Sequence, residues 1–534
     1  MFNKSINFYF FIFVLYSVYC AIEIGINWDT FYDYSNGKER LDYLFSLGAD
    51  DSYKNAVGRK YYAGLYITIS AFLVQFFPIK YNVEVIYLTN LFFSFCTIFG
   101  ISKLSKELFN KEIGKIVFAF CMLNAIFFGH MATNGKDTIV AFANVWALYS
   151  IIKYLKYQNI YEKRKKFIIF SGLSIGCGLG VRLSFLATII PIIVFLLLEI
   201  FLFKKIISKN FSIKRFLIDS IMVLLISYFI MILFWPDVHK NIFIYPFKLA
   251  IESFSFSFGA PLGLLNGYYF PSYDYPKNYI LVNLFYKMPE FIVLSFLIFP
   301  LILSKILNFF EKKIYGFRSK LFLIFLILIF PNIAILFGHY PLYDGMRLFL
   351  YLIPFINIFP AILLYYLFKN RQYVLSKFFM AILIVLQFFY ILNFFAMTPY
   401  HYVYLNLFAG KYSENSKKFE NDYWGISTKK LIEKLEKKNN LFGDSRINVA
   451  TCGMENDAAN YYLKKIRNLN YKMVDQYKGE KYDIIIMNNR VVWDDIGHTN
   501  PYNGRTCFEK FSGDDIITIK RRGLILSKIT KSTK

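Results

Sequence analysis

Residues 61–77, YYAGLYITISAFLVQFF, decide the arrangement of the whole chain, because they are apolar and just long enough to cross a bilayer. A transmembrane helix needs roughly 17–25 predominantly apolar residues. If this segment spans the membrane, every loop that follows it changes side. If it lies along the membrane surface, the later loops keep their side. The topology of the chain therefore depends on this one segment.

The composition narrows the class of protein. The chain has 534 residues, of which 56% are hydrophobic and 21% aromatic, and its formal net charge is +25. Soluble domains are about 45–50% apolar, and a disordered polycation has few aromatic residues. Basic loops between apolar spans account for both the high apolar content and the positive net charge of this chain. We therefore predict a polytopic α-helical membrane protein and no nucleic-acid partner. The six cysteines form no Cys-x-x-Cys pair, which argues against a zinc ribbon or a redox motif.

Eleven other apolar runs predict membrane spans within residues 1–397. They lie near residues 6–26, 83–102, 114–130, 138–152, 167–181, 183–203, 216–235, 288–304, 321–338, 348–368 and 378–397. We expect residues 61–77 to form a surface helix within a long outer loop, 27–82, and a second long outer loop at 236–287. The first run follows Lys4 as a secretory signal would, but no small-x-small cleavage site follows it, so a retained helix is expected.

The distribution of charge sets the sidedness. With a cytoplasmic N-terminus and a surface-lying 61–77 segment, the inner segments hold 24 basic residues and four acidic ones. The outer loops then hold 13 residues of each sign. Cytoplasmic loops carry the excess of Lys and Arg. We therefore predict eleven spans, a cytoplasmic N-terminus and a C-terminal segment outside.

Residues 398–534 contain no further span and are expected to form a small extracytoplasmic α/β domain. INVATCG (447–453) and YDIIIMNN (482–489) are typical of buried strands, and residues 456–469 suit a helix. Residues 514–529 predict a hairpin that turns at Arg522-Gly523. Cys452 and Cys507 both fall in this domain. They either pair in an oxidising compartment or remain two unrelated buried thiols, because sequence gives no distance between them.

The first candidate site is NWDTFYD (27–33), which follows the first span. It places Asp29 and Asp33 four residues apart, one turn apart if the segment is helical. A carboxylate here can deprotonate an incoming hydroxyl group. The structural alternative is a solvated loop in which Asp29 only caps a helix.

Two further outer turns carry charges at membrane boundaries. In the turn GHMATNGKDT (129–138), Lys136 can neutralise a phosphate, and Asp137 can position Lys136 or cap the next helix. Arg347 enters a span and Arg182 lies between two apolar segments. An arginine at such a depth needs an anionic partner or a route to the interface, and both lipid phosphate and Asp344 suit Arg347.

The order and sidedness of several motifs support a family resemblance. They are DTFY (29–32), YYAGLY (61–66), KLSKELF (103–109), FGHMATNGKD (128–137), YDGMRLFLYLIP (343–354), TPYHYVYLNLFAG (398–410) and FENDYWG (419–425). Together they resemble the GT-C class of membrane glycosyltransferases. The similar branch is the bacterial protein O-mannosyltransferase-related family, glycosyltransferase family 39.

The chain departs from the pattern of that family at four positions. Thr30 and Tyr32 stand where the family usually has Glu and His after the Asp, while Asp29 is kept. Ala63 and Gly135 each stand where the family usually has Pro. The loss of the Glu and His argues against a metal site or a second acid at this position of the family pattern.

The resemblance implies a donor sugar carried on a polyprenyl phosphate at the outer leaflet of a bacterial inner membrane. Asp29 would be the base on the acceptor hydroxyl, with inversion at the anomeric carbon, and Asp33 is a candidate second acid. Lys136, Asp137, Arg347 and Arg182 would bind or position the donor phosphate. The resemblance implies no cofactor and no metal ligand set, and it leaves a divalent metal open. The acceptor would be a lipid, a polysaccharide or a protein.

Two alternatives remain at the level of sequence. A secondary transporter also has many spans, but it often shows two related halves and acids at the bilayer midplane. Neither feature is evident here, and a folded outer tail fits transport poorly. An inactive or ligase-like relative of the same fold is the other alternative, because Thr30 replaces the second acid of the family.

Overall fold

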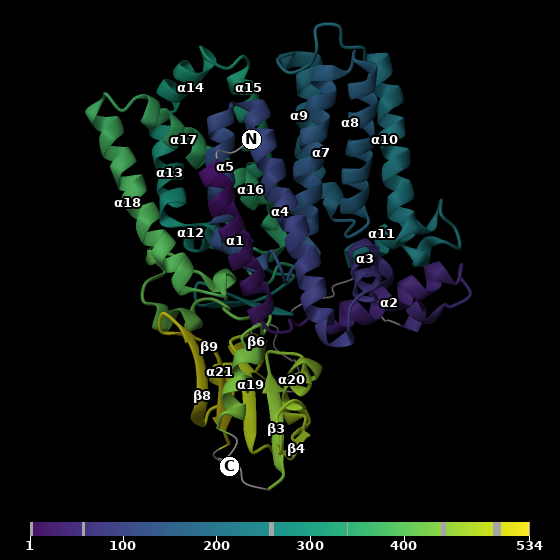
Figure 1. The fold of residues 1–534 in the computed structure, drawn as a ribbon, viewed down its shortest axis with the longest axis vertical. Helices are drawn as coiled ribbons and strands as arrows, with labels where there is room; N and C mark the ends of the chain where they lie inside the picture. The colour runs from purple at the N-terminus through teal and green to yellow at the C-terminus, as the bar shows by residue number, and fades with distance from the viewer. Residues whose placement is uncertain are drawn as a thin grey trace.

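The chain folds into a helical bundle with a mixed sheet at one end (Figure 1). The computed structural model describes residues 4–55, 59–255, 261–338, 340–438, 445–494 and 503–532, and every structural statement below concerns these residues. Helix α1 (Lys4–Glu23) runs along the bundle toward the end that carries the sheet (Figure 1).

Seven helices in the described part are long and apolar enough to span a membrane. They are Ile79–Leu108 (η3 and α4), Asp137–Tyr157 (α7), Phe185–Phe203 (α9 and η4), Ile213–Leu233 (α10), Phe317–Phe337 (α15), Arg347–Lys369 (η6, α16 and α17) and Val374–Ala396 (α18). An eighth arises if α12 (Tyr279–Lys287) and α13 (Glu290–Leu301), bent by 117°, form one broken span. A polytopic helical membrane protein is therefore confirmed.

The other predicted spans correspond to shorter or more polar helices. These are α1, α5 (Lys111–Met122), α6 (Ala125–His130) and α8 (Tyr161–Leu179). The run at 114–130 is divided because the side chain of Asn124 accepts a hydrogen bond from the backbone of Phe127 and starts a new helix. The count of eleven spans stays a prediction.

Residues 61–77, the segment that decides the topology, form a helix too short to cross the membrane. Helix α3 (Leu65–Val74) has ten residues, and at 1.5 Å per residue it covers about half of a bilayer core. It packs against α2 (Thr30–Phe45) where a side chain at Gly37 would overlap the backbone of Ile67. Figure 1 shows both helices at the end of the bundle that carries the sheet.

The basic segments between helices contact one another. Lys153 and Lys156 each lie 2.9 Å from a carboxylate oxygen of Glu107. Nearby, Ser319 donates a 3.2 Å hydrogen bond to buried Glu199. Segments that the positive-inside rule places together therefore also pack together.

The C-terminal residues form a five-stranded sheet in the order β4-β3-β5-β9-β8. The strands are β3 (Ile447–Cys452), β4 (Tyr471–Met473), β5 (Ile484–Asn488), β8 (Asp514–Arg521) and β9 (Leu524–Lys531), accompanied by α19 (Thr428–Glu436) and α20 (Asn456–Leu463). Strand β3 runs parallel to β4 and β5, and β9 is antiparallel to β5 and β8. The predicted strands, helix and hairpin are all present, and the hairpin turns through the positive φ angles of Arg522 and Gly523. The boundary at residue 398 stays a prediction.

The long segment 236–287 contacts the C-terminal sheet region. It contains α11 (Tyr245–Ser255) and the hairpin of β1 (Leu262–Leu265) and β2 (Tyr268–Pro271). Leu262 and Leu264 pack with Val491, the first residue of β6 (Val491–Trp493), which pairs with β7 (Gly504–Thr506).

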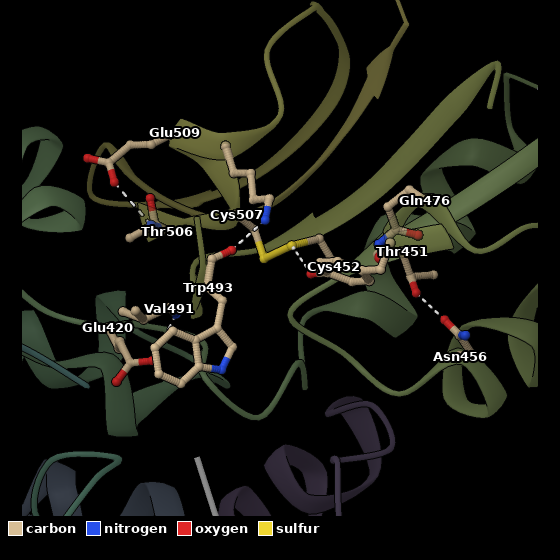
Figure 2. The surroundings of a disulfide bond; sticks show 12 residues. Glu420, Thr451, Cys452, Asn456, Gln476, Val491, Trp493, Thr506, Cys507 and Glu509 are labelled. Atoms are coloured by element: carbon tan, nitrogen blue, oxygen red, sulfur yellow. Dashed lines mark hydrogen bonds between the residues drawn. A yellow bond between two sulfur atoms is a disulfide. The ribbon is translucent and has the colours of Figure 1, made fainter. Parts of the chain in front are cut away.

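Cys452 and Cys507 form a disulfide, which decides between the two alternatives left open by the sequence. Their Cα atoms lie 5.8 Å apart. The bond joins the end of β3 to the start of α21 (Cys507–Lys510). Figure 2 shows it between two groups of side chains, Thr451, Asn456 and Gln476 on one side and Val491 and Trp493 on the other.

Candidate active site

Asp29 directly precedes α2, and its position is fixed by Asn27. The Asn27 side-chain oxygen accepts hydrogen bonds from the Asp29 backbone at 2.9 Å and from the Thr30 hydroxyl at 2.8 Å. The Asn27 amide donates to the carbonyl of Thr133 at 2.8 Å, which ties this turn to the turn that carries Lys136. The Asp29 side chain makes no capping hydrogen bond, so its carboxylate is available to other partners.

Arg347 is the centre of a charge network. Its guanidinium nitrogens lie 2.8 Å from Asp29, 2.9 Å from Asp344 and 3.3 Å from Asp137. Arg182 lies 3.2 Å from the other oxygen of Asp137. Since Asp137 and Asp344 are almost fully buried, the two arginines supply the positive charge that such carboxylates require.

Lys136 joins the two acids of the first candidate site. Its ammonium lies 2.9 Å from Asp33 and 3.7 Å from Asp29. Asp137, for which the sequence predicted a role in positioning Lys136 or capping a helix, pairs with Arg182 and Arg347. All six residues singled out from the sequence thus meet in one network.

The two acids of the site differ in their electrostatics. Burial alone would raise the pKa of the Asp29 carboxyl, but Lys136 and Arg347 outweigh it and hold that pKa well below its usual range. Burial and the neighbouring charge of Asp29 raise the pKa of Asp33 in spite of Lys136. Asp29 is therefore the acid that is held ionised, and opposite shifts in one pair are typical of functional sites.

A cavity of about 850 Å³ opens beside this network. Asp29, Asp33, Lys136, Arg182 and Arg347 line it from the bundle. The opposite wall consists of C-terminal residues, among them Thr451, Glu455, Asn456, Gln476, Arg490 and Trp493. The cavity therefore lies between the bundle and the C-terminal sheet, and its size suits a small-molecule site.

Arg490 is the main site residue that the sequence analysis missed. Its guanidinium lies 4.9 Å from the ring centre of Trp28 and 3.6 Å from Asp344. It follows β5, as Gly453 and Glu455 follow β3. Ligands of open α/β sheets bind beyond the carboxyl ends of parallel strands, so a charged residue directly after a predicted buried strand was the available signal.

The chemistry of the site is that of an anion pocket with one carboxylate. Lys136, Arg182, Arg347 and Arg490 can contact a phosphate, and Asp29 can accept a proton. Across the described ranges, no group of three or more His, Cys, Asp or Glu side chains is arranged to hold a metal ion.

Comparison by sequence gives no match to a family model or to a curated protein. Comparison by structure matches ArnT from Cupriavidus metallidurans in the apo state, with a TM-score of 0.51, 10% identity, 99% of this chain covered and 98% of that chain. The chain has the ArnT fold. At this identity the likeness concerns the fold alone.

Two related structures are also similar. ArnT from the same organism bound to undecaprenyl phosphate has a TM-score of 0.49 at 10% identity, with 98% of each chain covered. Oligosaccharyltransferase AglB from Archaeoglobus fulgidus, in complex with an inhibitory peptide and a dolichol-phosphate, has a TM-score of 0.49 at 9% identity. That match covers 91% of this chain and 70% of AglB.

Proposed function

We propose that this chain transfers a sugar from a polyprenyl-phosphate donor to an acceptor hydroxyl, with Asp29 as the base. The observation that carries this proposal is the position of Asp29 between Lys136 and Arg347 at the wall of the 850 Å³ cavity. A carboxylate and a set of cations within one cavity are what a phosphate leaving group and a hydroxyl nucleophile require together.

The reaction is a single displacement at the anomeric carbon. The acceptor oxygen forms a bond to that carbon while the bond to the phosphate oxygen breaks, and the configuration inverts. The acceptor proton passes to Asp29, and the negative charge of the leaving polyprenyl phosphate is stabilised by Lys136 and Arg347, with Arg182 next to them. No nucleotide takes part in this step.

Donor binding and base strength are coupled in this geometry. Without a ligand, Lys136 and Arg347 neutralise Asp29, which makes it a weak base. A phosphate that draws these cations toward itself raises the proton affinity of Asp29. Asp29 therefore becomes a stronger base when the donor is bound.

The comparison with ArnT supports a lipid-linked donor. ArnT, whose fold this chain shares, has been crystallised with undecaprenyl phosphate. We extend the proposal to a bacterial plasma membrane crossed eleven times, with the basic segments around Glu107 inside and the cavity and C-terminal sheet outside. A relation to glycosyltransferase family 39 and transfer of a hexose or pentose belong to the same proposal.

Membranes that contain the chain, incubated with labelled polyprenyl-phosphate sugars, test the proposal. The expected result is a labelled product that is absent from membranes lacking the chain. Uptake of the label into sealed vesicles without product would favour the transporter. Retention of bound donor without transfer would favour the inactive relative.

A further inference from the structure

A second cavity, of about 710 Å³, lies beside the first. It opens between α2 and α20, two helices that Figure 1 shows on the same side of the molecule. The two cavities share Trp28, Tyr32 and Glu455 as a common wall. We call the second cavity the α2–α20 groove. A molecule bound in it would lie next to the site of Asp29.

The lining of the α2–α20 groove is aromatic and polar. Four rings contribute to it: Trp28, Phe31, Tyr32 and Tyr461. The other lining residues are Ser35, Glu455, Asp457, Asn460, Lys464 and Lys465. Among these described lining residues there is no aliphatic side chain.

This lining matches the amphipathic character of a sugar ring. A pyranose presents C–H groups on its faces, which pack on aromatic rings, and hydroxyl groups at its edge, which hydrogen-bond to carboxylates, amides and hydroxyls. The rings of Phe31 and Tyr461 meet edge to face at 5.7 Å between centres. Asn460 accepts a 2.6 Å hydrogen bond from Tyr471, which orients its amide in the groove wall.

Other acceptors fit the groove less well. A lipid chain needs aliphatic contacts, which this lining lacks. An extended peptide would need a free strand edge, whereas residues of two helices provide most of the wall. The charges are two acids, Glu455 and Asp457, and two lysines, Lys464 and Lys465, so no strongly charged polymer is selected.

Glu455 links the groove to the reaction site. It lines both cavities, and burial together with Asp457 and Asp29 raises the pKa of its carboxyl. A carboxyl group at this junction can hydrogen-bond to one hydroxyl of an acceptor while a neighbouring hydroxyl reaches Asp29.

We infer that the α2–α20 groove binds a saccharide acceptor through its four aromatic rings, and that Glu455 orients the acceptor toward Asp29. This inference rests on the proposed function for the transfer step. Binding of the saccharide itself does not depend on transfer, and the two can be measured separately.

The test uses the full chain in detergent and a panel of neutral di- and trisaccharides of glucose, mannose and N-acetylglucosamine. We expect at least one of them to bind, and Tyr461→Ala to weaken that binding about tenfold or more. Tyr461→Phe, which keeps the ring, should retain most of it. Tyr268→Ala is the matched control, because Tyr268 is 76% exposed and belongs to neither cavity.

Three outcomes would overturn the inference. They are no binding across the panel, binding that Tyr461→Ala leaves unchanged, and binding of a peptide or lipid probe, but no saccharide, that Tyr461→Ala abolishes. Undecaprenyl phosphate is measured in parallel. If it fails to bind while saccharide binding depends on Tyr461, the proposed function fails and the saccharide groove stands.

Discussion

The guanidinium of Arg347 lies 2.8 Å from the carboxylate of Asp29, although the two residues are 318 positions apart in the chain. Asp29 follows the first helix of the bundle, and Arg347 begins one of the last spans. The ion pair therefore closes the end of the bundle that faces the cavity.

Asp29→Asn should reduce sugar transfer about 10²–10⁴-fold, the usual contribution of a general base. The amide keeps the shape of the side chain but cannot accept the proton. The measurement is the initial rate of transfer from a labelled polyprenyl-phosphate sugar, at matched amounts of inserted protein. Asp51→Asn is the control, since Asp51 is exposed and pairs with Lys54. Full activity of Asp29→Asn would remove Asp29 from the mechanism.

Arg347→Gln should destabilise the protein by about 3–5 kcal/mol, because it leaves buried Asp137 and Asp344 without their shared cation. Arg347→Lys should recover only part of this, since one ammonium cannot replace a planar group that contacts three carboxylates. The apparent Tm in detergent measures the effect. The double variant Arg347→Gln, Asp344→Asn should lose less than the sum of the single losses. Strict additivity would show that the network is not coupled.

Gly135→Ala should disturb the site through Tyr66. A methyl group at Gly135 would overlap the ring of Tyr66, which comes from α3. Overpacking of this kind costs about 1–3 kcal/mol, and the shift of the turn should also reduce transfer by displacing Lys136. Tyr66→Ala in the same chain should restore part of the stability. A Gly135→Ala variant with unchanged Tm and activity would contradict this packing.

Glu420 should make stability fall as the pH rises. Burial and the nearby Asp344 raise the pKa of Glu420 to about 7, from an ordinary value of 4.5. Between these values the folded protein holds a proton that the unfolded chain has lost, so stability decreases as the pH passes from about 5 to 8. At about 1.4 kcal/mol per pKa unit, the loss is on the order of 2 kcal/mol or more.

The variant Glu420→Gln tests this, because Gln keeps an oxygen to accept the 3.0 Å hydrogen bond from Val491 but cannot ionise. Its apparent Tm relative to the unmodified protein should be higher at pH 8 than at pH 5. Glu433→Gln, on the exposed surface of α19, should show no such change. If the apparent Tm of Glu420→Gln differed from that of the unmodified protein by the same amount at pH 5 and pH 8, the result would contradict the raised pKa of Glu420.

Cysteine labelling in intact cells tests the orientation. An impermeant maleimide should reach Ser413→Cys from outside, and Lys163→Cys only after the membrane is opened. Both positions are exposed, so accessibility within the protein does not limit the reaction. The unmodified chain is the control, since its described free cysteines are buried or half-buried. Labelling of Lys163→Cys in intact cells would reverse the proposed sidedness.

The individual charges of the site could be found from the sequence because each is anomalous in its local setting. Arg347 and Arg182 stand at the ends of apolar runs, where an unpaired charge is costly. Lys136 and Asp29 follow spans on the side that the positive-inside rule assigns to the outside. Arg490 was missed because it lies outside the apolar runs, where a charge costs little, and its one signal is its place directly after a buried strand.

The sequence by itself determined the membrane class and the strands of the C-terminal sheet. These properties depend on local hydrophobicity and on the length of each run, which neighbouring residues report directly. Tertiary structure alone decided that Arg347 is shared by three carboxylates, that Cys452 pairs with Cys507, and that C-terminal residues form one wall of the cavity. Contacts between residues hundreds of positions apart depend on how the helices and the sheet pack, and no local pattern encodes that packing.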